Sequence, residues 1–250
     1  EVVGVNSQIY SRTGGFMGLS FAIPIDVAMQ VVDQLKSQGH VSRGWLGVQI
    51  QDVTRELAES FGMKKPEGAL VSRILSKSPA EAAGVQIGDI ITEFNGQEIV
   101  SSADLPPMVG RTRIGDTARI RVIRAGGHKE LSVKIGALPD DDEPVSSAPE
   151  QPDSRTVDRL GLAVTNPTRE QREQLEIPAQ NGVLVQGINP GAAYDAGVRR
   201  GDVILRIQDQ TIKDVAHFNS IVKTLTPGKS VALLVQRRGN ALFLALKLKG

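Results

Sequence analysis

The stretch AAGVQIGDIITEFNGQEI (Ala82–Ile99) returns in altered form as DAGVRRGDVILRIQDQTI (Asp195–Ile212). Both copies share Ala-Gly-Val-x-x-Gly-Asp, followed by Ile or Val and then Ile. The similarity extends upstream, from GALVSRI to GVLVQGI, and downstream, from IGDTARIRVIRAGG to PGKSVALLVQRRGN. Self-similarity over such a length indicates one structural unit that occurs twice. We therefore expect two copies of one domain, at residues 43–137 and 157–250.

The pattern within each copy predicts several short strands and a few short helices. Val48 and Ile50 alternate with glutamines, which is typical of a half-buried strand. Helices are expected at residues 55–61 and 102–109 of the first copy and at 215–225 of the second. We expect a mainly β fold with short α-helices, in which each repeat is a small, partly open β-barrel with two helices.

Two segments lie outside the repeats. Residues 1–42 contain two candidate strands, EVVGVNSQIY and MGLSFAIP, joined by a hairpin at SRTGG. A helix then follows, for which Asp26 is the expected N-cap and Gly39 the expected C-cap. Residues 138–156 are acidic and rich in Pro and Ser, which favours a flexible linker. An acidic docking strip is the alternative for this linker.

Composition excludes several classes of function. The net charge of +1 does not favour nucleic acid as a partner, and no apolar run is long enough for a membrane helix. There are no cysteines, so disulfides, thiol catalysis and thiolate metal sites are excluded. His40, His128 and His217 lie far apart in the sequence, so we expect no metal and no cofactor.

A glycine interrupts a strand entrance in both repeats, in RGWLGVQI (Arg43–Ile50) and in RLGLAV (Arg159–Val164). Glycine adopts backbone conformations that are closed to other residues and permits close approach of a ligand. Successive N–H groups in such a turn form a concave anion site. A peptide can add to the following strand edge while its terminal carboxylate occupies that site. We therefore predict a peptide-binding groove in each repeat.

Each repeat resembles a PDZ domain, and the whole chain resembles the C-terminal part of an HtrA/Deg-family serine protease. The resemblance is carried by VVGVNSQI, GFMGLSFAIP, RGWLGV, SPAEAAGVQIGDIITEFNG and RRGDVIL. It implies that residues 1–42 are the remnant of a trypsin-like β-barrel and that two PDZ domains follow. It further implies a bacterial periplasmic location, a role in protein quality control, and assembly with other protease subunits. The expected ligands are unfolded or C-terminal segments of substrate proteins, bound with roughly micromolar affinity, about −8 kcal/mol.

The resemblance also assigns the residues of the two grooves. Backbone N–H groups of the first loop would hold the carboxylate, and apolar side chains of the strand and the opposing helix would form the pocket. Met108 is the preferred groove residue, whereas Leu105 and Val109 have the spacing of core positions. Because Pro106 and Pro107 stand near the start of this helix, a shortened or shifted helix is expected. The predicted set is Arg43, Trp45, Leu46, Gly47, Val48, Ile50, Leu105, Met108, Val109, Leu160, Gly161, Leu162, Val164, Phe218, Ile221 and Val222.

The sequence contains no recognisable catalytic triad. The family nucleophile belongs to a Gly-Asn-Ser-Gly-Gly motif, and neither Ser7, Ser11 nor Ser20 lies in one. A triad serine needs an imidazole base within hydrogen-bond reach. We expect this chain to be inactive alone. Two alternatives remain: a structural oligomerisation module with closed grooves, and a protease that is active when the upstream half is supplied in trans.

Overall fold

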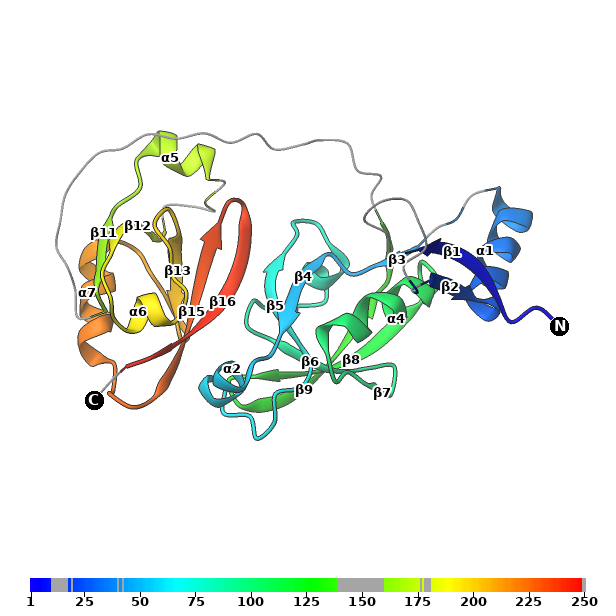
Figure 1. The fold of residues 1–250 in the computed structure, drawn as a ribbon, viewed down its shortest axis with the longest axis horizontal. Helices are drawn as coiled ribbons and strands as arrows, with labels where there is room; N and C mark the ends of the chain where they lie inside the picture. The colour runs from blue at the N-terminus through cyan, green and yellow to red at the C-terminus, as the bar shows by residue number, and fades with distance from the viewer. Residues whose placement is uncertain are drawn as a thin grey trace. The chain divides into compact units, whose positions relative to one another are not determined.

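The computed structural model describes residues 1–9, 18, 20–39, 41, 43–138, 160–175, 177 and 181–248. The chain divides into two compact units, Glu1–Arg43 and Gly44–Gly250. The expected SRTGG hairpin and the expected linker centre lie outside the described residues. Figure 1 shows the elements of both units.

The first unit is a two-stranded antiparallel sheet followed by a helix. Strand β1 (Gly4–Ile9) pairs with β2 (Ser20–Pro24), which confirms the two expected strands. Helix α1 (Ile25–Gln38) ends at Gly39, which has φ +75° and donates to the Leu35 carbonyl as the expected C-cap. The expected N-cap was wrong: Pro24 holds that position and Asp26 lies in the first turn. Proline precedes the helix because it has no N–H to satisfy.

The second unit contains both repeats, and each repeat forms an open sheet. The first sheet has the strand order β4-β5-β6-β8-β9, with β7 paired to β6, and β3 pairs separately with β10. The bounds in the first repeat are β3 (Gly44–Trp45), β4 (Val48–Asp52), α2 (Arg55–Ser60), β5 (Ala69–Ile74), α3 (Pro79–Ala82), β6 (Ile90–Phe94), β7 (Gln97–Glu98), α4 (Leu105–Arg111), β8 (Thr117–Arg124), β9 (Gly127–Lys134) and β10 (Gly136–Ala137).

The second repeat reproduces this order almost element for element. Its sheet runs β11-β12-β13-β15-β16, with β14 paired to β13. Its bounds are β11 (Leu162–Thr165), α5 (Arg169–Gln174), β12 (Val183–Ile188), α6 (Ala192–Asp195), β13 (Val203–Ile207), β14 (Gln210–Thr211), α7 (Val215–Thr224), β15 (Ser230–Arg237) and β16 (Asn240–Lys247). The sequence repeat is therefore a structural repeat, mainly β with short helices.

The helix expected over residues 102–109 is split. A single 3₁₀ turn, η1 (Ser102–Asp104), precedes α4, and Pro106 and Pro107 occupy the first turn of α4. Prolines fit there because the first N–H groups of a helix have no intrahelical acceptor. The helix is thus shifted towards its C-terminal side, as the prolines predicted.

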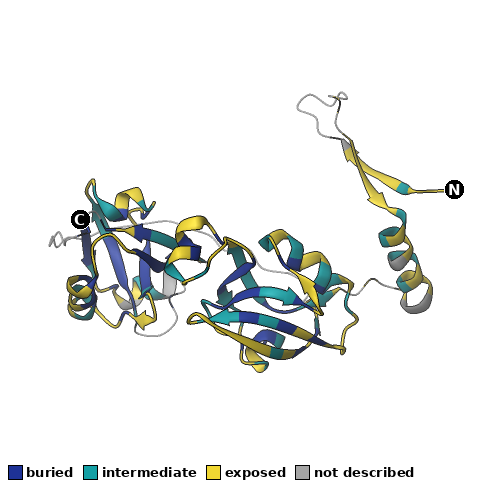
Figure 2. Cartoon of the chain, turned by 90° about the horizontal axis from the view of Figure 1, so that it is seen from below, coloured by how far each residue is buried: buried dark blue, intermediate teal, exposed yellow. Residues whose placement is uncertain are grey.

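Each repeat has its own apolar core, and a third cluster joins the two sheets. Leu70 on β5 and Ile90 on β6 lie in this third cluster together with Leu205 on β13 and Leu234 on β15. Each of these side chains is at most 9% exposed. Figure 2 shows the buried colour running through the strands of the second unit, whereas strands β1 and β2 of the first unit are mostly exposed. The two repeats therefore pack through the sheet faces that point away from their own cores.

Polar contacts extend this sheet-to-sheet interface. The Gln51 amide on β4 donates to the Phe243 carbonyl (3.1 Å) and accepts from the Phe243 N–H (2.7 Å). Ser230 donates to Glu59 (2.8 Å). The Gln51 side chain thus satisfies backbone groups at the edge strand β16, which would otherwise template further strand pairing.

Candidate peptide-binding site

The loop between β3 and β4 is fixed at two points. The Gly47 carbonyl accepts from the Leu75 N–H (2.9 Å), and the Leu46 carbonyl accepts from the Ala80 N–H (2.9 Å). Gly47 has φ +77°, a left-handed conformation that side chains rarely adopt. A Cβ at Gly47 would lie 2.2 Å from the Ser78 Cβ, so the position has no room for a side chain. Local strain and close packing together require glycine here.

The N–H groups of Leu46 and Gly47 have no hydrogen-bond acceptor within the part of the chain that the structure describes. Both residues are buried, and buried backbone N–H groups are nearly always paired. With the carbonyls of both residues bound to the scaffold, the two donors remain for a ligand. An anion site at these two donors stays a prediction from the sequence.

The predicted groove would have strand β4 on one side and helix α4 on the other. Strand β4 is an edge of its sheet, so its outer backbone groups are open to an added strand. Val48, Ile50 and Met108 are half-buried and pack against the first core, whereas Leu105 (1% exposed) and Val109 (6% exposed) belong to that core. Met108 is thus the helix residue best placed for a ligand among these three.

Asp52 connects the end of β4 to the turn that precedes α4. Its carboxylate at the end of β4 accepts from the Ser102 N–H (2.9 Å) and the Ser101 hydroxyl (3.2 Å), just before α4. These hydrogen bonds, that from the Ser102 backbone first, hold the pKa of Asp52 below its usual value. The carboxylate is therefore charged at neutral pH and holds the helix start to the strand.

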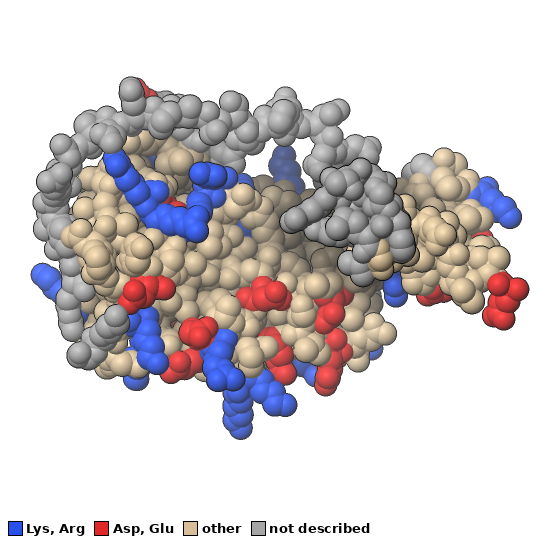
Figure 3. Space-filling view, in the orientation of Figure 1, with Lys and Arg blue, Asp and Glu red and all other residues tan. Residues whose placement is uncertain are grey.

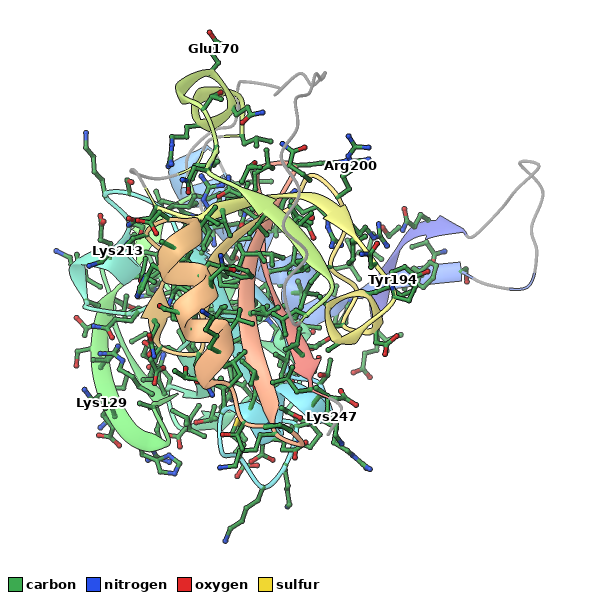
Figure 4. The ribbon with its side chains drawn as sticks, turned by 90° about the vertical axis from the view of Figure 1, so that its left-hand side faces the viewer. Lys129, Glu170, Tyr194, Arg200, Lys213 and Lys247 are labelled. Atoms are coloured by element: carbon green, nitrogen blue, oxygen red, sulfur yellow. The ribbon has the colours of Figure 1, made fainter. Side chains whose placement is uncertain are left out.

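The second repeat forms the same loop, and the side chains around it are more deeply buried. Gly161 has φ +83°, its carbonyl accepts from Asn189 (2.8 Å), and the Leu160 carbonyl accepts from Ala193 (3.4 Å). Figures 1 and 4 both show α7 beside β11. The predicted side chains of this groove are nearly inaccessible: Leu160, Leu162, Val164, Phe218, Ile221 and Val222 are each at most 6% exposed.

Arg43 and Trp45 flank the first loop differently. Arg43 is exposed and is the last residue of the first unit. Trp45 is half-buried on β3, and its ring would lie 3.0 Å from a Cβ at Gly47. The fluorescence of Trp45 should therefore respond to a ligand bound at this loop.

A family model described as "PDZ domain" matches residues 44–135 and again residues 159–248. The chain belongs to the PDZ-domain family. Each match contains one Leu-Gly loop followed by a strand at the edge of its sheet, and the two repeats are called the first and second PDZ domains below.

The curated relatives are similar along almost the whole chain. A probable periplasmic serine endoprotease DegP-like from Pseudomonas putida (strain GB-1) is 49% identical over 99% of this chain and 52% of its own length. A protein of the same name from Hahella chejuensis (strain KCTC 2396) is 48% identical over 99% of this chain and 52% of its own. The chain thus spans about half the length of the curated relatives it matches. These matches confirm the resemblance to the HtrA/Deg family.

Solved structures give the same family. The HtrA-type protease AlgW with a tripeptide is 36% identical, with a TM-score of 0.50, covering 56% of this chain and 46% of its own. A variant of the HtrA-type protease AlgW with a decapeptide is also 36% identical with a TM-score of 0.50, covering 59% of this chain and 44% of its own.

Sequence reasoning missed a buried ion pair that occurs in both PDZ domains. Asp89 is fully buried and receives two hydrogen bonds of 2.7 Å from Arg124. Asp202 and Arg237 form the same pair at the same distances. Hydrogen bonding to Asp89 raises the pKa of Arg124, and hydrogen bonding to Asp202 raises that of Arg237. The available signal was an arginine at the same repeat position, 35 residues after each aspartate.

The described residues show no metal site and, on the face drawn in Figure 3, no strongly charged patch. On the face shown in Figure 3, acidic and basic side chains are interspersed. Among the residues that the structure describes, no group of three His, Cys, Asp or Glu side chains is arranged to hold a metal. None of the described helices is long and apolar enough to cross a membrane.

Proposed function

We propose that the first PDZ domain binds the C-terminal carboxylate of an extended peptide, which adds as a strand to β4. The observation that carries this proposal is the Leu46–Gly47 loop, whose carbonyls are bound to the scaffold while its N–H groups have no acceptor in the described structure. Val48, Ile50 and Met108 supply half-buried apolar surface for the last peptide side chains. Strand addition supplies affinity through the main chain, and such a pocket supplies specificity.

A different role follows for the second PDZ domain. Phe218, Ile221 and Val222 of α7 are at most 4% exposed, whereas Met108, at the position of Ile221 in the repeat, is half-buried. The same domain contributes β13, β15 and β16 to the sheet-to-sheet interface. These two observations favour a structural role with a closed groove, in which the second domain supports the first.

The chain fits the peptide-binding and assembly portion of a periplasmic HtrA/Deg-type serine endopeptidase that acts in protein quality control. Support comes from relatives named as periplasmic serine endoproteases, of which the chain spans about half, 52%. Residues 1–42 are then part of a trypsin-like domain, and residues 138–156 the linker between the PDZ domains. In this proposal, subunits of the same protease are the assembly partners and unfolded or C-terminal segments are the substrates.

Paired glycine substitutions test the assignment of the groove. Gly47→Ala places a Cβ 2.2 Å from Ser78 and forces φ +77° on alanine, so it should abolish binding of a hydrophobic peptide with a free C-terminus. Gly161→Ala is the matched change in the second domain, where the Cβ would meet the Asn189 carbonyl at 3.0 Å. Calorimetry should show binding lost in the first variant and retained in the second. Circular dichroism melts confirm that both variants fold, and unchanged binding in Gly47→Ala would refute the proposal.

A further inference from the structure

A cleft of about 690 Å³ lies between the two PDZ domains, apart from both grooves. Its floor is apolar: Leu205 and Leu234 come from the second sheet, and the rings of Phe61 and Phe243 meet edge to face with centroids 5.6 Å apart. Polar and charged side chains line the rest of the cleft, among them Asn181, Arg206 and Asp209. Clefts of this size that combine apolar and polar lining are typical of small-molecule sites. The cleft therefore has the dimensions of a binding site that the peptide-binding function does not use.

One cation in this cleft lacks an acid partner. Arg206 is half-buried on β13, and its Nη1 donates across the cleft to the Ile87 carbonyl (3.0 Å). Its Nε is buried without a hydrogen-bond partner, and Arg206 forms no ion pair within the described ranges. The other arginine of the cleft, Arg124, is paired with Asp89. A half-buried guanidinium without an anion is costly, and a carboxylate is its best partner.

We propose that this cleft binds an amphipathic carboxylate, with the carboxylate on Arg206 and the apolar body on Phe61 and Phe243. Asp89 does not oppose the anion because Arg124 neutralises it. Asp209 lines the cleft as an exposed acid and weakens the site. Two sources share this chemistry, a fatty acid and the last residue of an apolar peptide. Either one contacts both PDZ domains and stabilises their packing by mass action.

The test follows the Arg206 Nε–H signal by ¹⁵N–¹H correlation spectroscopy of the full chain. All samples carry Gly47→Ala, so that peptide binding at the first loop does not contribute. The signal is assigned by its loss in Arg206→Lys. Octanoate and N-acetyl-leucyl-leucine are the two carboxylate probes, and octanamide is the neutral control. We expect a saturable shift with octanoate for a fatty acid site, or with the dipeptide for a peptide site, and none with octanamide.

Two charge variants test the cause of binding, with the backbone amide of Phe243 as reporter. Arg206→Gln should raise the Kd of the bound carboxylate about tenfold or more, because a hydrogen bond to a charged group is lost. Asp209→Asn should lower the same Kd. The proposal is overturned if neither carboxylate shifts the Arg206 signal, if octanamide binds equally well, or if Arg206→Gln leaves the Kd unchanged.

Discussion

At the scale of single residues, the repeated Gly-Asp pair shows what the local sequence predicts and what it does not. Glycine is typical of a turn that needs a positive φ, and Gly88 has φ +95°. What local reasoning missed is Asp89, which also accepts from the Gln86 N–H (2.8 Å) while Arg124 binds both its oxygens. Burial of a carboxylate depends on a partner 35 residues away, and no turn motif specifies that partner.

Breaking the Asp89–Arg124 ion pair should lower the free energy of unfolding much more than breaking an exposed ion pair. Arg124→Ala leaves Asp89 buried without its cation and should lower the free energy of unfolding by about 3–5 kcal/mol. The matched change is Arg121→Ala, because Arg121 pairs with Glu93 and Glu130 but is 43% exposed, so about 0–1 kcal/mol is expected. Denaturant titration measures both, and equal losses in the two variants would contradict the role of the buried pair.

At the scale of elements, both grooves carry the same tether between strand and helix. Asp52 connects the end of β4 to η1, and Asn166, just after β11, accepts from the Val215 N–H (2.9 Å) at the start of α7. Sequence periodicity predicted the strands and helices that are tethered. It did not predict the tethers, because a polar residue after a strand is equally common in unconstrained turns.

Removing the tether of the first groove should weaken peptide binding without abolishing it. Asp52→Ala loses two hydrogen bonds across the groove, so the peptide Kd should rise about two- to tenfold. Asn166→Ala is the matched control in the second domain and should leave that Kd unchanged. A Kd for Asp52→Ala equal to that of the unaltered chain would show that the tether does not shape the groove.

The Asp52 tether should also depend on pH. The folded pKa of Asp52 lies below its usual value, so the stabilisation is complete above the unfolded pKa, near 3.8, and is lost as pH falls through the lowered folded value. The ¹³C shift of the Asp52 carboxyl should therefore titrate below the values of exposed aspartates. Titration at or above the usual value would contradict the assigned hydrogen bonds.

At the scale of the whole molecule, the second unit is stabilised by packing between the repeats as well as within them. The repeat and the alternating strand pattern predicted two copies of one mainly β domain, and the family resemblance identified them as PDZ domains. They did not predict the interface, although β15 carried a signal for it. Its residues Val231–Val235 are all apolar and buried, whereas apolar and polar residues alternate in the matching strand β8. An apolar strand of this kind is buried on both faces.

A charge placed in this interface should separate the two PDZ domains. Leu234 is 2% exposed, and Leu234→Lys buries an unpaired charge there. Because the chain has no cysteine, spin labels at Glu98→Cys and Lys213→Cys report one distance between the domains. We expect a narrow distance distribution in the unaltered chain and a broad one in Leu234→Lys. A broad distribution in both would show that the domains do not pack stably.

The central claim is that the loop around Gly47 holds a peptide carboxylate. The most direct measurement is a titration followed by fluorescence of Trp45, the single tryptophan of the chain, whose ring lies against Gly47. The titrant is a hydrophobic peptide with a free C-terminus, compared with the same peptide amidated. We predict a saturable change with the free acid that largely disappears with the amide. An equal response to both peptides, or no response confirmed by calorimetry, would contradict the claim.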